Sequence, residues 1–180
     1  MDISIFFKPL EIDIAAAKHS FRKIVASYNK ASDFPSLEEI DIAIIGVEEE
    51  RGAHNNEGCA AGADEVRRFL YGLNIGAFSA KIADLGNITA GDTIEDTYYA
   101  LSNTVEALVK KKILPIIIGG SQDLTFANYS AYQKMEQTVN LVSIDNRFDI
   151  GNSESGLDDS TYLSKIILHQ PNFLFNFSNL

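Results

Sequence analysis

Short apolar runs and helical patterns alternate along the chain. Residues 41–47 and 139–144 are brief, apolar and rich in β-branched side chains, which is the pattern of strands covered on both faces. Between residues 94 and 108, apolar side chains recur at helical spacing and form one buried stripe. This alternation predicts an α/β fold with three α/β/α layers around a mainly parallel sheet.

The individual elements follow from the same patterns and from the residues that start and stop helices. We expect helices at 15–28, 63–71, 94–108, 124–135 and 161–169, and strands at 41–47, 80–86, 115–118, 139–144 and 172–177. Asp92 or Thr93 is the expected N-cap of the third helix.

Length and the last strand bear on domain organisation. A chain of 180 residues forms one domain or most of one. The sequence closes directly after the apolar run 172–177, without the helix or polar tail that usually covers such an edge. We therefore expect residues 1–180 to be a single domain and the N-terminal part of a longer protein. A stop codon directly after Leu180 would contradict this expectation.

Charge and cysteine content argue against several classes of function. The net charge of −10 argues against binding to nucleic acid, whose phosphates require a basic surface. No stretch approaches the roughly 20 apolar residues that span a bilayer, so we expect no membrane partner. Cys59 is the only cysteine, which excludes an internal disulfide and favours a reducing, cytoplasmic compartment.

The candidate chemistry gathers where the strand at 139–144 ends. Asp145, Arg147 and Asp149 follow this strand at alternate positions, and they share one face if the backbone stays extended. Two carboxylates at the carboxyl end of a parallel strand are typical of half a metal site. The side chain between them is a guanidinium that cannot lose its charge. The segment therefore combines metal-ligating residues with a group that opposes a metal.

Four segments of the chain carry a resemblance to a known family. They are 45–67, which contains the loop NNEGCAAGA and then Val-Arg, followed by 83–88 (ADLGNI), 114–120 (LPIIIGG) and 145–149 (DNRFD). Their order and spacing resemble the ureohydrolase superfamily, which includes arginase, agmatinase and formimidoylglutamase. Formimidoylglutamase is the nearest member by the style of its loops. The similarity covers residues 42–149, with the extension 1–40 outside it.

The resemblance implies an arginase-like fold and hydrolysis of a C–N bond in a small amidino or formimino compound. Members of the family use two manganese ions to activate a hydroxide, and they generally form symmetric homo-oligomers. Carried across residue by residue, Asp145 and Asp149 are retained metal-ligand positions. Gln122 and Arg147 stand where the family has histidine ligands, and the catalytic residues are not identified.

Two functions remain open on these residues. Arg147 places a fixed positive charge where a dication would bind, and at about 4 Å and an effective dielectric near 20 each charge pair costs about 4 kcal/mol. This favours a degenerate member with a binding or structural role, in which Arg147 pairs with the carboxylates and manganese is absent. The alternative is an active hydrolase with altered metal use, in which Asp145, Asp149 and Gln122 hold one Mg²⁺ and Arg147 turns away.

Other polar residues near the predicted strand ends have simpler interpretations. His54, Asn55 and Asn56 occupy a polar loop that suits either contact with substrate, as the resemblance implies, or ordinary solvation. The charged run 48–51 is expected to be solvated, although the resemblance implies that this loop approaches the substrate, where Arg51 could meet a carboxylate. Asp84 is expected to cap a strand or a turn.

Overall fold

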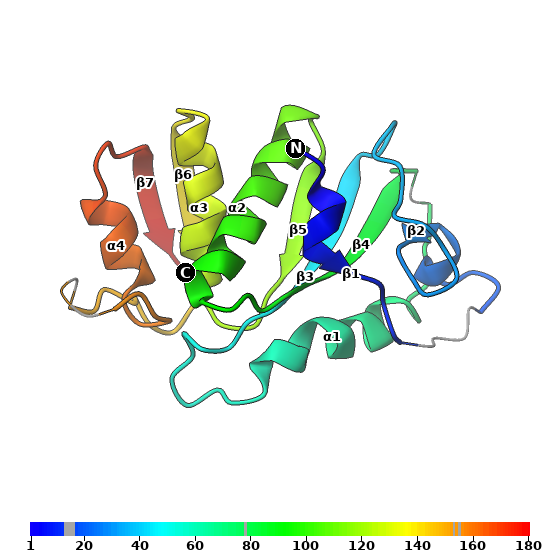
Figure 1. The fold of residues 1–180 in the computed structure, drawn as a ribbon, viewed down its shortest axis with the longest axis horizontal. Coiled ribbons are helices and arrows are strands. Elements are labelled where there is room, and N and C mark those ends of the chain that lie inside the picture. The colour runs from blue at the N-terminus through cyan, green and yellow to red at the C-terminus, as the bar shows by residue number, and fades with distance from the viewer. Residues whose placement is uncertain (13–16, 78, 153, 155) are drawn as a thin grey trace.

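The computed structural model describes residues 1–12, 17–77, 79–152, 154 and 156–180 (Figure 1). The helices are α1 (Gly62–Leu70), α2 (Ile94–Lys110), α3 (Leu124–Lys134) and α4 (Tyr162–Leu168), and the short 3-10 turns are η1 (Ile3–Phe6), η2 (Phe21–Lys23) and η3 (Cys59–Ala61). The strands are β1 (Phe7–Lys8), β2 (Val25–Ser27), β3 (Ile42–Glu48), β4 (Ile82–Thr89), β5 (Leu114–Ile118), β6 (Val139–Ser143) and β7 (Leu174–Asn179).

Within the described residues, the strands form two sheets. The larger sheet has the order β1-β4-β3-β5, and β2 also pairs with β4. β3 is parallel to both β4 and β5, whereas β1 is antiparallel to β4. β6 and β7 form a second, parallel pair. The pairing is therefore mainly parallel, as the alternation of strands and helices predicts.

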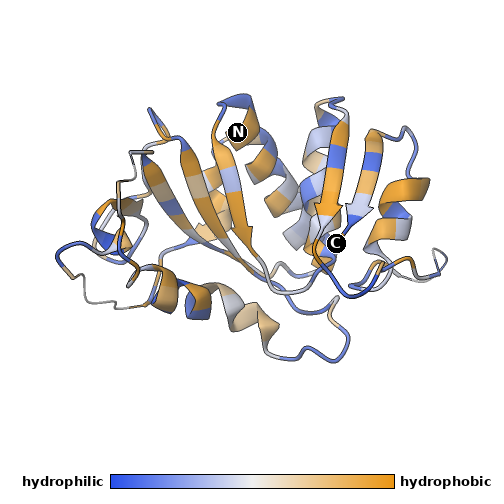
Figure 2. Cartoon of the chain, turned by 180° about the vertical axis from the view of Figure 1, so that it is seen from behind, coloured by the Kyte–Doolittle hydropathy of each residue, from blue (hydrophilic) through white to orange (hydrophobic). Residues whose placement is uncertain are grey.

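Helices cover both faces of the larger sheet. Ala43, Ile45 and Val47 of β3 belong to the main hydrophobic core, which includes side chains of α2 and α3. Ile44 belongs instead to a smaller core, against which Leu70 of α1 packs. Because successive side chains of a strand point to opposite faces, α1 lies on one side of the sheet, and α2 and α3 lie on the other. Apolar residues run along these strands in Figure 2. The α/β architecture expected from the sequence, with helices on both faces of a mainly parallel sheet, is confirmed.

The predicted elements from residue 41 onward are all present, with their ends shifted by a few residues. The helix expected at 15–28 is wrong. Residues 13–16 lie outside the described part, and residues 17–28 contain η2 and β2. In β2, Val25 and Ser27 are buried while the residue between them is exposed, because the strand pairs with β4 and alternates with period two.

The longest helix, α2, begins at one of the two predicted caps. The backbone N–H of Asp96 donates to Oγ1 of Thr93 (3.2 Å), and the backbone N–H of Thr93 donates to the Asp96 carboxylate (2.8 Å). This reciprocal capping box satisfies amides that have no partner inside the helix. None of the helices in the described ranges is both long and apolar enough to cross a membrane.

A buried ion pair fixes α1 to β4. The guanidinium of Arg67 donates from Nε and Nη2 to the two carboxylate oxygens of Asp84, at 2.8 and 2.9 Å, and both side chains are fully buried. The Tyr71 hydroxyl donates to the same carboxylate (2.6 Å), and Arg67 Nη1 donates to Oδ1 of Asn87 (2.5 Å). Asp84 also accepts the backbone N–H of Gly86 (3.1 Å), which is the turn cap expected from the sequence, and it neutralises the buried arginine in addition.

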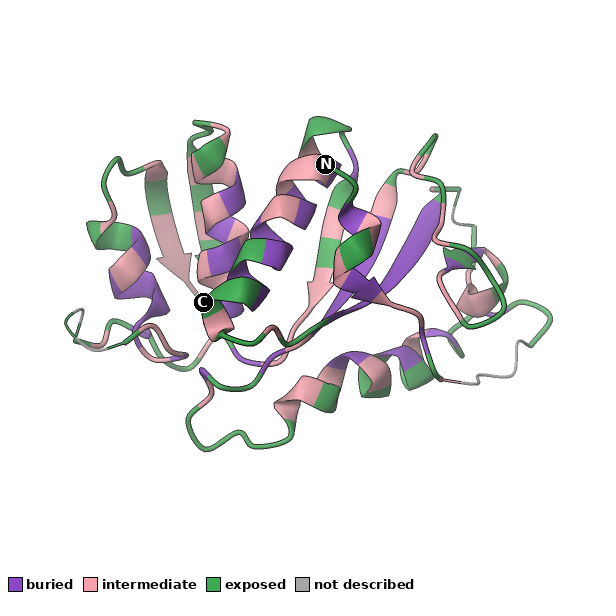
Figure 3. Cartoon of the chain, viewed as in Figure 1, coloured by how far each residue is buried: buried purple, intermediate pink, exposed green. Residues whose placement is uncertain are grey.

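Burial is uneven among the parallel strands. β3 and β4 are buried along almost their whole length, whereas β5 and β6 keep several exposed residues (Figure 3). The reason is position, since β5 and β6 each end a sheet and no other described strand pairs with their second edge. The sequences of β5 and β6 are typical of strands that are covered on both faces, yet these two strands keep exposed residues in the structure.

Candidate functional site

The candidate residues lie beyond the carboxyl ends of β3, β5 and β6, which point toward the same side of the molecule (Figure 1). Open parallel sheets bind ligands at these ends, where loops leave the strands. Residues 49–61 follow β3, residues 119–123 follow β5, and the segment that begins at residue 144 follows β6.

The turn after β6 does not continue the strand. The carboxylate of Asp145 accepts the backbone N–H of Arg147 (3.0 Å), which closes a local turn, and Asp149 adopts a left-handed conformation with φ of 49°. The side chain of Arg147 is 54% exposed and that of Asp149 is 1% exposed. The backbone therefore does not stay extended, and the condition under which Asp145, Arg147 and Asp149 would share one face is not met.

Arg147 and Asp149 nevertheless contact each other. Nε of Arg147 lies 3.2 Å from Oδ1 of Asp149, which forms an ion pair. Neither oxygen of the Asp149 carboxylate accepts a hydrogen bond from the described residues. Burial raises the pKa of Asp149, while the nearby Arg147 lowers it and the charge of Asp145 raises it further. The structure thus brings three predicted site residues, Asp145, Arg147 and Asp149, into one turn.

Gln122 follows β5 and is exposed. Its Nε2 lies 3.4 Å from the hydroxyl of Tyr162 in α4, which is a long hydrogen bond. No hydrogen bond joins Gln122 to Asp145 or Asp149 within the described residues. The side chain instead borders two hollows beside α3.

The loop after β3 is tied to the segment that precedes α4. His54 contacts Asp159 through Nδ1 and Oδ1 (2.8 Å), and its backbone N–H donates to Oδ2 (3.0 Å). The backbone N–H of Asp159 donates in turn to the carbonyl of Gly52 (2.9 Å). The hydrogen bond to Asp159 raises the pKa of His54, whose ring stays 58% exposed. Asn55 and Asn56 are exposed beside it.

Sequence reasoning missed the partners of His54. Ligand atoms of His54, Asp158 and Asp159 all lie within 4.8 Å of one another, and in the described ranges they are the group of three potential metal ligands that the fold assembles. Neither Asp145 nor Asp149 belongs to this group. The adjacent Asp158 and Asp159 were a signal in the sequence, but their partner His54 lies 105 residues from Asp159.

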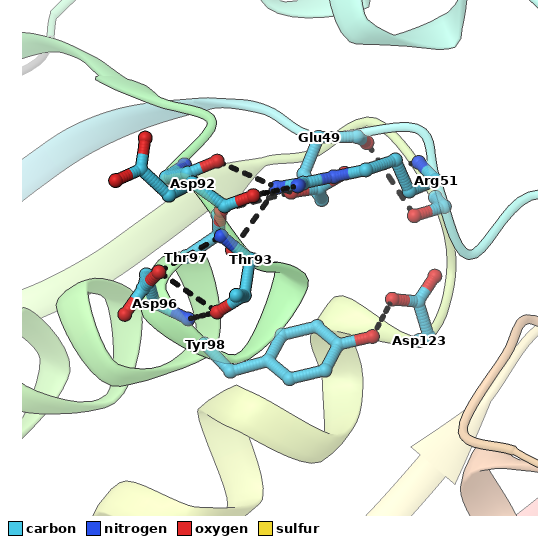
Figure 4. A network of polar contacts seen from close by, with 10 residues as sticks. Glu49, Arg51, Asp92, Thr93, Asp96, Thr97, Tyr98 and Asp123 are labelled. Carbon is cyan, nitrogen blue, oxygen red and sulfur yellow. Dashed lines mark hydrogen bonds and ion pairs between the residues drawn. The ribbon is translucent and has the colours of Figure 1, made fainter.

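The charged run 48–51 was expected to be solvated; Glu50 and Arg51 are exposed, but Glu49 is buried. Glu49 is 1% exposed and is held by Arg51 through Nε (2.9 Å) and Nη2 (2.5 Å), and by the hydroxyl of Thr97 (2.8 Å) (Figure 4). The same guanidinium donates to the carbonyls of Gly91, Asp92 and Thr93. Burial raises the pKa of Glu49, but the hydrogen bonds from Arg51 outweigh it and the pKa falls below its ordinary value. Arg51 therefore joins the β3 loop to the start of α2.

The turn after β5 packs tightly against the same loop. The backbone N–H of Ser121 donates to the carbonyl of Glu49 (3.0 Å), so this amide is already occupied. Asp123 is fully buried, accepts a hydrogen bond from the hydroxyl of Tyr98, and has one oxygen without a partner in the described part (Figure 4). A Cβ on Gly52 would overlap the Asp123 carboxylate, so only glycine fits this position.

This geometry, a mainly parallel sheet with acidic side chains at its carboxyl edge, agrees with comparisons to known proteins. The sequence profile described as the arginase family matches residues 40–176. The chain therefore belongs to the arginase family.

Within that family, the chain is similar to formimidoylglutamases. It is 27% identical over 125 residues to the formimidoylglutamase of Macrococcus caseolyticus, which covers 66% of this chain and 40% of that protein. A formiminoglutamase of Trypanosoma cruzi solved with Mn²⁺ superposes with a TM-score of 0.67 at 24% identity, covering 76% of this chain and 51% of that one. A formimidoylglutamase of Bacillus subtilis gives 0.69 at 18% identity, covering 93% and 54%. The chain thus spans about half the length of these relatives.

Proposed function

We propose that this arginase-family chain is a degenerate formimidoylglutamase-like member, whose strand-end site serves binding or structure without the two manganese ions of its family. The observation that carries the proposal is the ion pair between Arg147 Nε and Asp149 Oδ1, at 3.2 Å. A guanidinium held against a carboxylate already supplies the positive charge that a metal would supply there.

The donor set also fits two manganese ions poorly. Manganese is a hard cation that suits charged carboxylate oxygen, and Gln122 offers only a neutral amide oxygen that adds no negative charge. A dication about 4 Å from Arg147 would meet a repulsion of about 8 kcal/mol at an effective dielectric near 20, reduced by solvent because the guanidinium is half exposed. The arrangement favours Arg147 as the resident cation of this site.

Metal analysis tests this proposal directly. The purified protein is loaded with excess Mn²⁺, dialysed, and its bound manganese is counted by mass spectrometry. We expect well under one ion per chain. The double substitution Gln122→His with Arg147→His should raise the affinity for Mn²⁺ at least tenfold, because it removes the cation and adds two imidazoles. Arg68→His, an exposed arginine of α1, is the matched control and should change nothing.

Two manganese ions per wild-type chain would overturn the proposal. An unchanged affinity in the double variant would show that Gln122 and Arg147 do not occupy the ligand positions assigned to them.

A second candidate function rests on a separate observation. The buried Asp149 carboxylate has no hydrogen-bond donor within the described residues, and such oxygens suit a hard cation. An active hydrolase would hold one Mg²⁺ with Asp145, Asp149 and Gln122 while Arg147 turns toward solvent, and its substrate would be a small formimino or amidino compound. Release of formamide from formimidoylglutamate, dependent on Mg²⁺ and lost in Asp149→Asn, would establish this function and defeat the first.

The proposal also covers domain organisation, location and assembly. It takes residues 1–180 as one arginase-like domain and as the N-terminal part of a longer protein, in which the family match that begins at residue 40 leaves residues 1–39 outside. The net charge of −10 supports a protein without nucleic-acid partners, and the single Cys59 supports a cytoplasmic location. Homo-oligomers are expected from the resemblance, and sedimentation of the purified protein tests this.

A further inference from the structure

A histidine and two aspartates meet between the loop after β3 and the segment before α4. One potential metal-ligand atom from each of His54, Asp158 and Asp159 lies within 4.8 Å of the other two. Nδ1 of His54 lies 2.8 Å from Oδ1 of Asp159. None of the three residues is among the ligand positions that the family resemblance assigns to manganese. The cluster is therefore a separate group of chemistry-bearing side chains.

Hydrogen bonds hold both carboxylates of this cluster in place. Oδ2 of Asp159 accepts the backbone N–H of His54 (3.0 Å), and the backbone N–H of Asp159 donates to the carbonyl of Gly52 (2.9 Å). Oδ1 of Asp158 accepts the backbone N–H and the hydroxyl of Ser160, at 2.9 and 2.8 Å. Each carboxylate is thus fixed through one oxygen, and its second oxygen is the one that can bind a cation.

The charges of the cluster do not balance. The two aspartates outweigh the single positive charge that the ring of His54 can carry. The hydrogen bond to Asp159 raises the pKa of His54 most, the charges of both aspartates raise it further, and Arg147 has the smallest opposing effect. The Asp159 side chain is only 9% exposed, so water stabilises its charge poorly. The cluster therefore favours a cation.

A neighbouring buried carboxylate supports the same conclusion independently. The Asp149 side chain is 1% exposed, and neither of its oxygens accepts a hydrogen bond within the described residues. Burial raises the pKa of Asp149, and the negative charge of Asp159 adds to that rise, so the two carboxylates are close enough to repel each other. A cation bound to Asp159 would reduce this repulsion.

The ligand types and their spacing indicate the kind of cation. A set of imidazole nitrogen and carboxylate oxygen suits zinc and its neighbours, whereas magnesium and calcium are bound mainly by oxygen. Two ligands of a tetrahedral zinc ion, with bonds of about 2.0–2.1 Å, lie about 3.3 Å apart. The cluster can reach this spacing through small movements, because the His54 ring is 58% exposed and Asp158 is partly exposed.

We propose that His54, Asp158 and Asp159 bind one divalent transition-metal ion of the zinc type, with water completing its coordination. The ion takes the place of the proton between Nδ1 of His54 and Oδ1 of Asp159, since an imidazole ligand must be deprotonated. It then joins the loop after β3 to the segment before α4 through three side chains. This site goes beyond the proposed function and agrees with it, because manganese binds such ligands more weakly than zinc or cobalt does.

Binding of Co²⁺ to the purified, untagged chain tests the proposal. Cobalt accepts the same ligands as zinc, and its visible absorption changes when protein side chains coordinate it. We expect one Co²⁺ per chain, displaced by excess Zn²⁺. His54→Gln and Asp158→Asn should each weaken the affinity for Co²⁺ about tenfold or more, because each removes a ligand.

Two control variants match these substitutions. His19→Gln and Asp33→Asn change exposed residues outside the cluster and should leave the affinity for Co²⁺ unchanged. Circular dichroism checks that every variant is folded. A variant of Asp159 is not used, because Asp159 also holds the backbone of His54.

A wild-type chain that binds no Co²⁺ would overturn the proposal. Equal affinities in His54→Gln and His19→Gln would overturn it as well, because the metal would then lie elsewhere. The manganese count tests the strand-end positions and these variants test the cluster, so this inference and the proposed function fail separately.

Discussion

Two arginine–aspartate pairs of this molecule have different geometry and different surroundings. Arg67 and Asp84 form a bidentate pair, both fully buried, with further hydrogen bonds from Tyr71 and to Asn87. Arg147 and Asp149 share one contact of 3.2 Å, and the guanidinium is half exposed. The first pair is satisfied on every side, whereas the Asp149 carboxylate accepts no hydrogen bond from the described residues. The same two residue types therefore play different roles. Arg67 and Asp84 fix α1 to β4, whereas the pair of Arg147 and Asp149 leaves the Asp149 carboxylate able to accept another partner.

The largest expected effect is at the buried pair. Arg67→Met leaves the Asp84 charge buried without its partner, which typically costs about 3–5 kcal/mol of unfolding free energy. Urea unfolding measures the loss. Arg68→Met, at the exposed neighbour in α1, should stay within about 0.5 kcal/mol. A loss under about 1 kcal/mol for Arg67→Met would show that the pair does not hold α1 to β4.

An intermediate effect is expected at Glu49, whose partner Arg51 is partly exposed. Hydrogen bonds from Arg51 lower the pKa of Glu49 below its ordinary value of 4.5, although burial opposes them. The folded protein therefore holds the ionised carboxylate more strongly than the unfolded chain, so its contribution is present above pH 4.5 and is lost as the pH falls through the lowered pKa. Glu49→Gln should lose about 1–3 kcal/mol at pH 7 and show a flatter decline in unfolding free energy below pH 4.5. An identical decline in both proteins would contradict this assignment.

The smallest effect is expected at the strand-end pair. Arg147→Gln should cost at most about 1 kcal/mol, because solvent screens the exposed guanidinium. Thermal unfolding measures this difference with the wild-type protein and Arg68→Gln run in parallel. A loss as large as that of Arg67→Met would remove the contrast between the two pairs and would mark Arg147 as a structural residue.

The parts of the fold that the sequence predicted are those with local signals. β3, β5 and β6 are short apolar runs, and α2 has both a helical stripe and a capping residue, so their positions follow from nearby residues alone. The expected helix at 15–28 failed because β2 owes its conformation to pairing with β4, which no local pattern reveals.

The roles of charged residues were harder to predict, because their partners are distant in the sequence. Asp84 is 17 residues from Arg67, and His54 is 105 residues from Asp159. Asp149 was predicted to lie near Arg147, and the structure places the two in contact, but through a turn rather than along an extended strand. Spacing therefore identified which residues gather at the strand end, but it did not predict their orientation.

The link between His54 and Asp159 has a mechanical consequence. One carboxylate grips both the ring and the backbone of His54, and the backbone of Asp159 is bonded back to Gly52. The loop after β3, which contains Gly52 and His54, is therefore coupled to the segment before α4, which contains Asp159. A displacement of one segment is expected to displace the other.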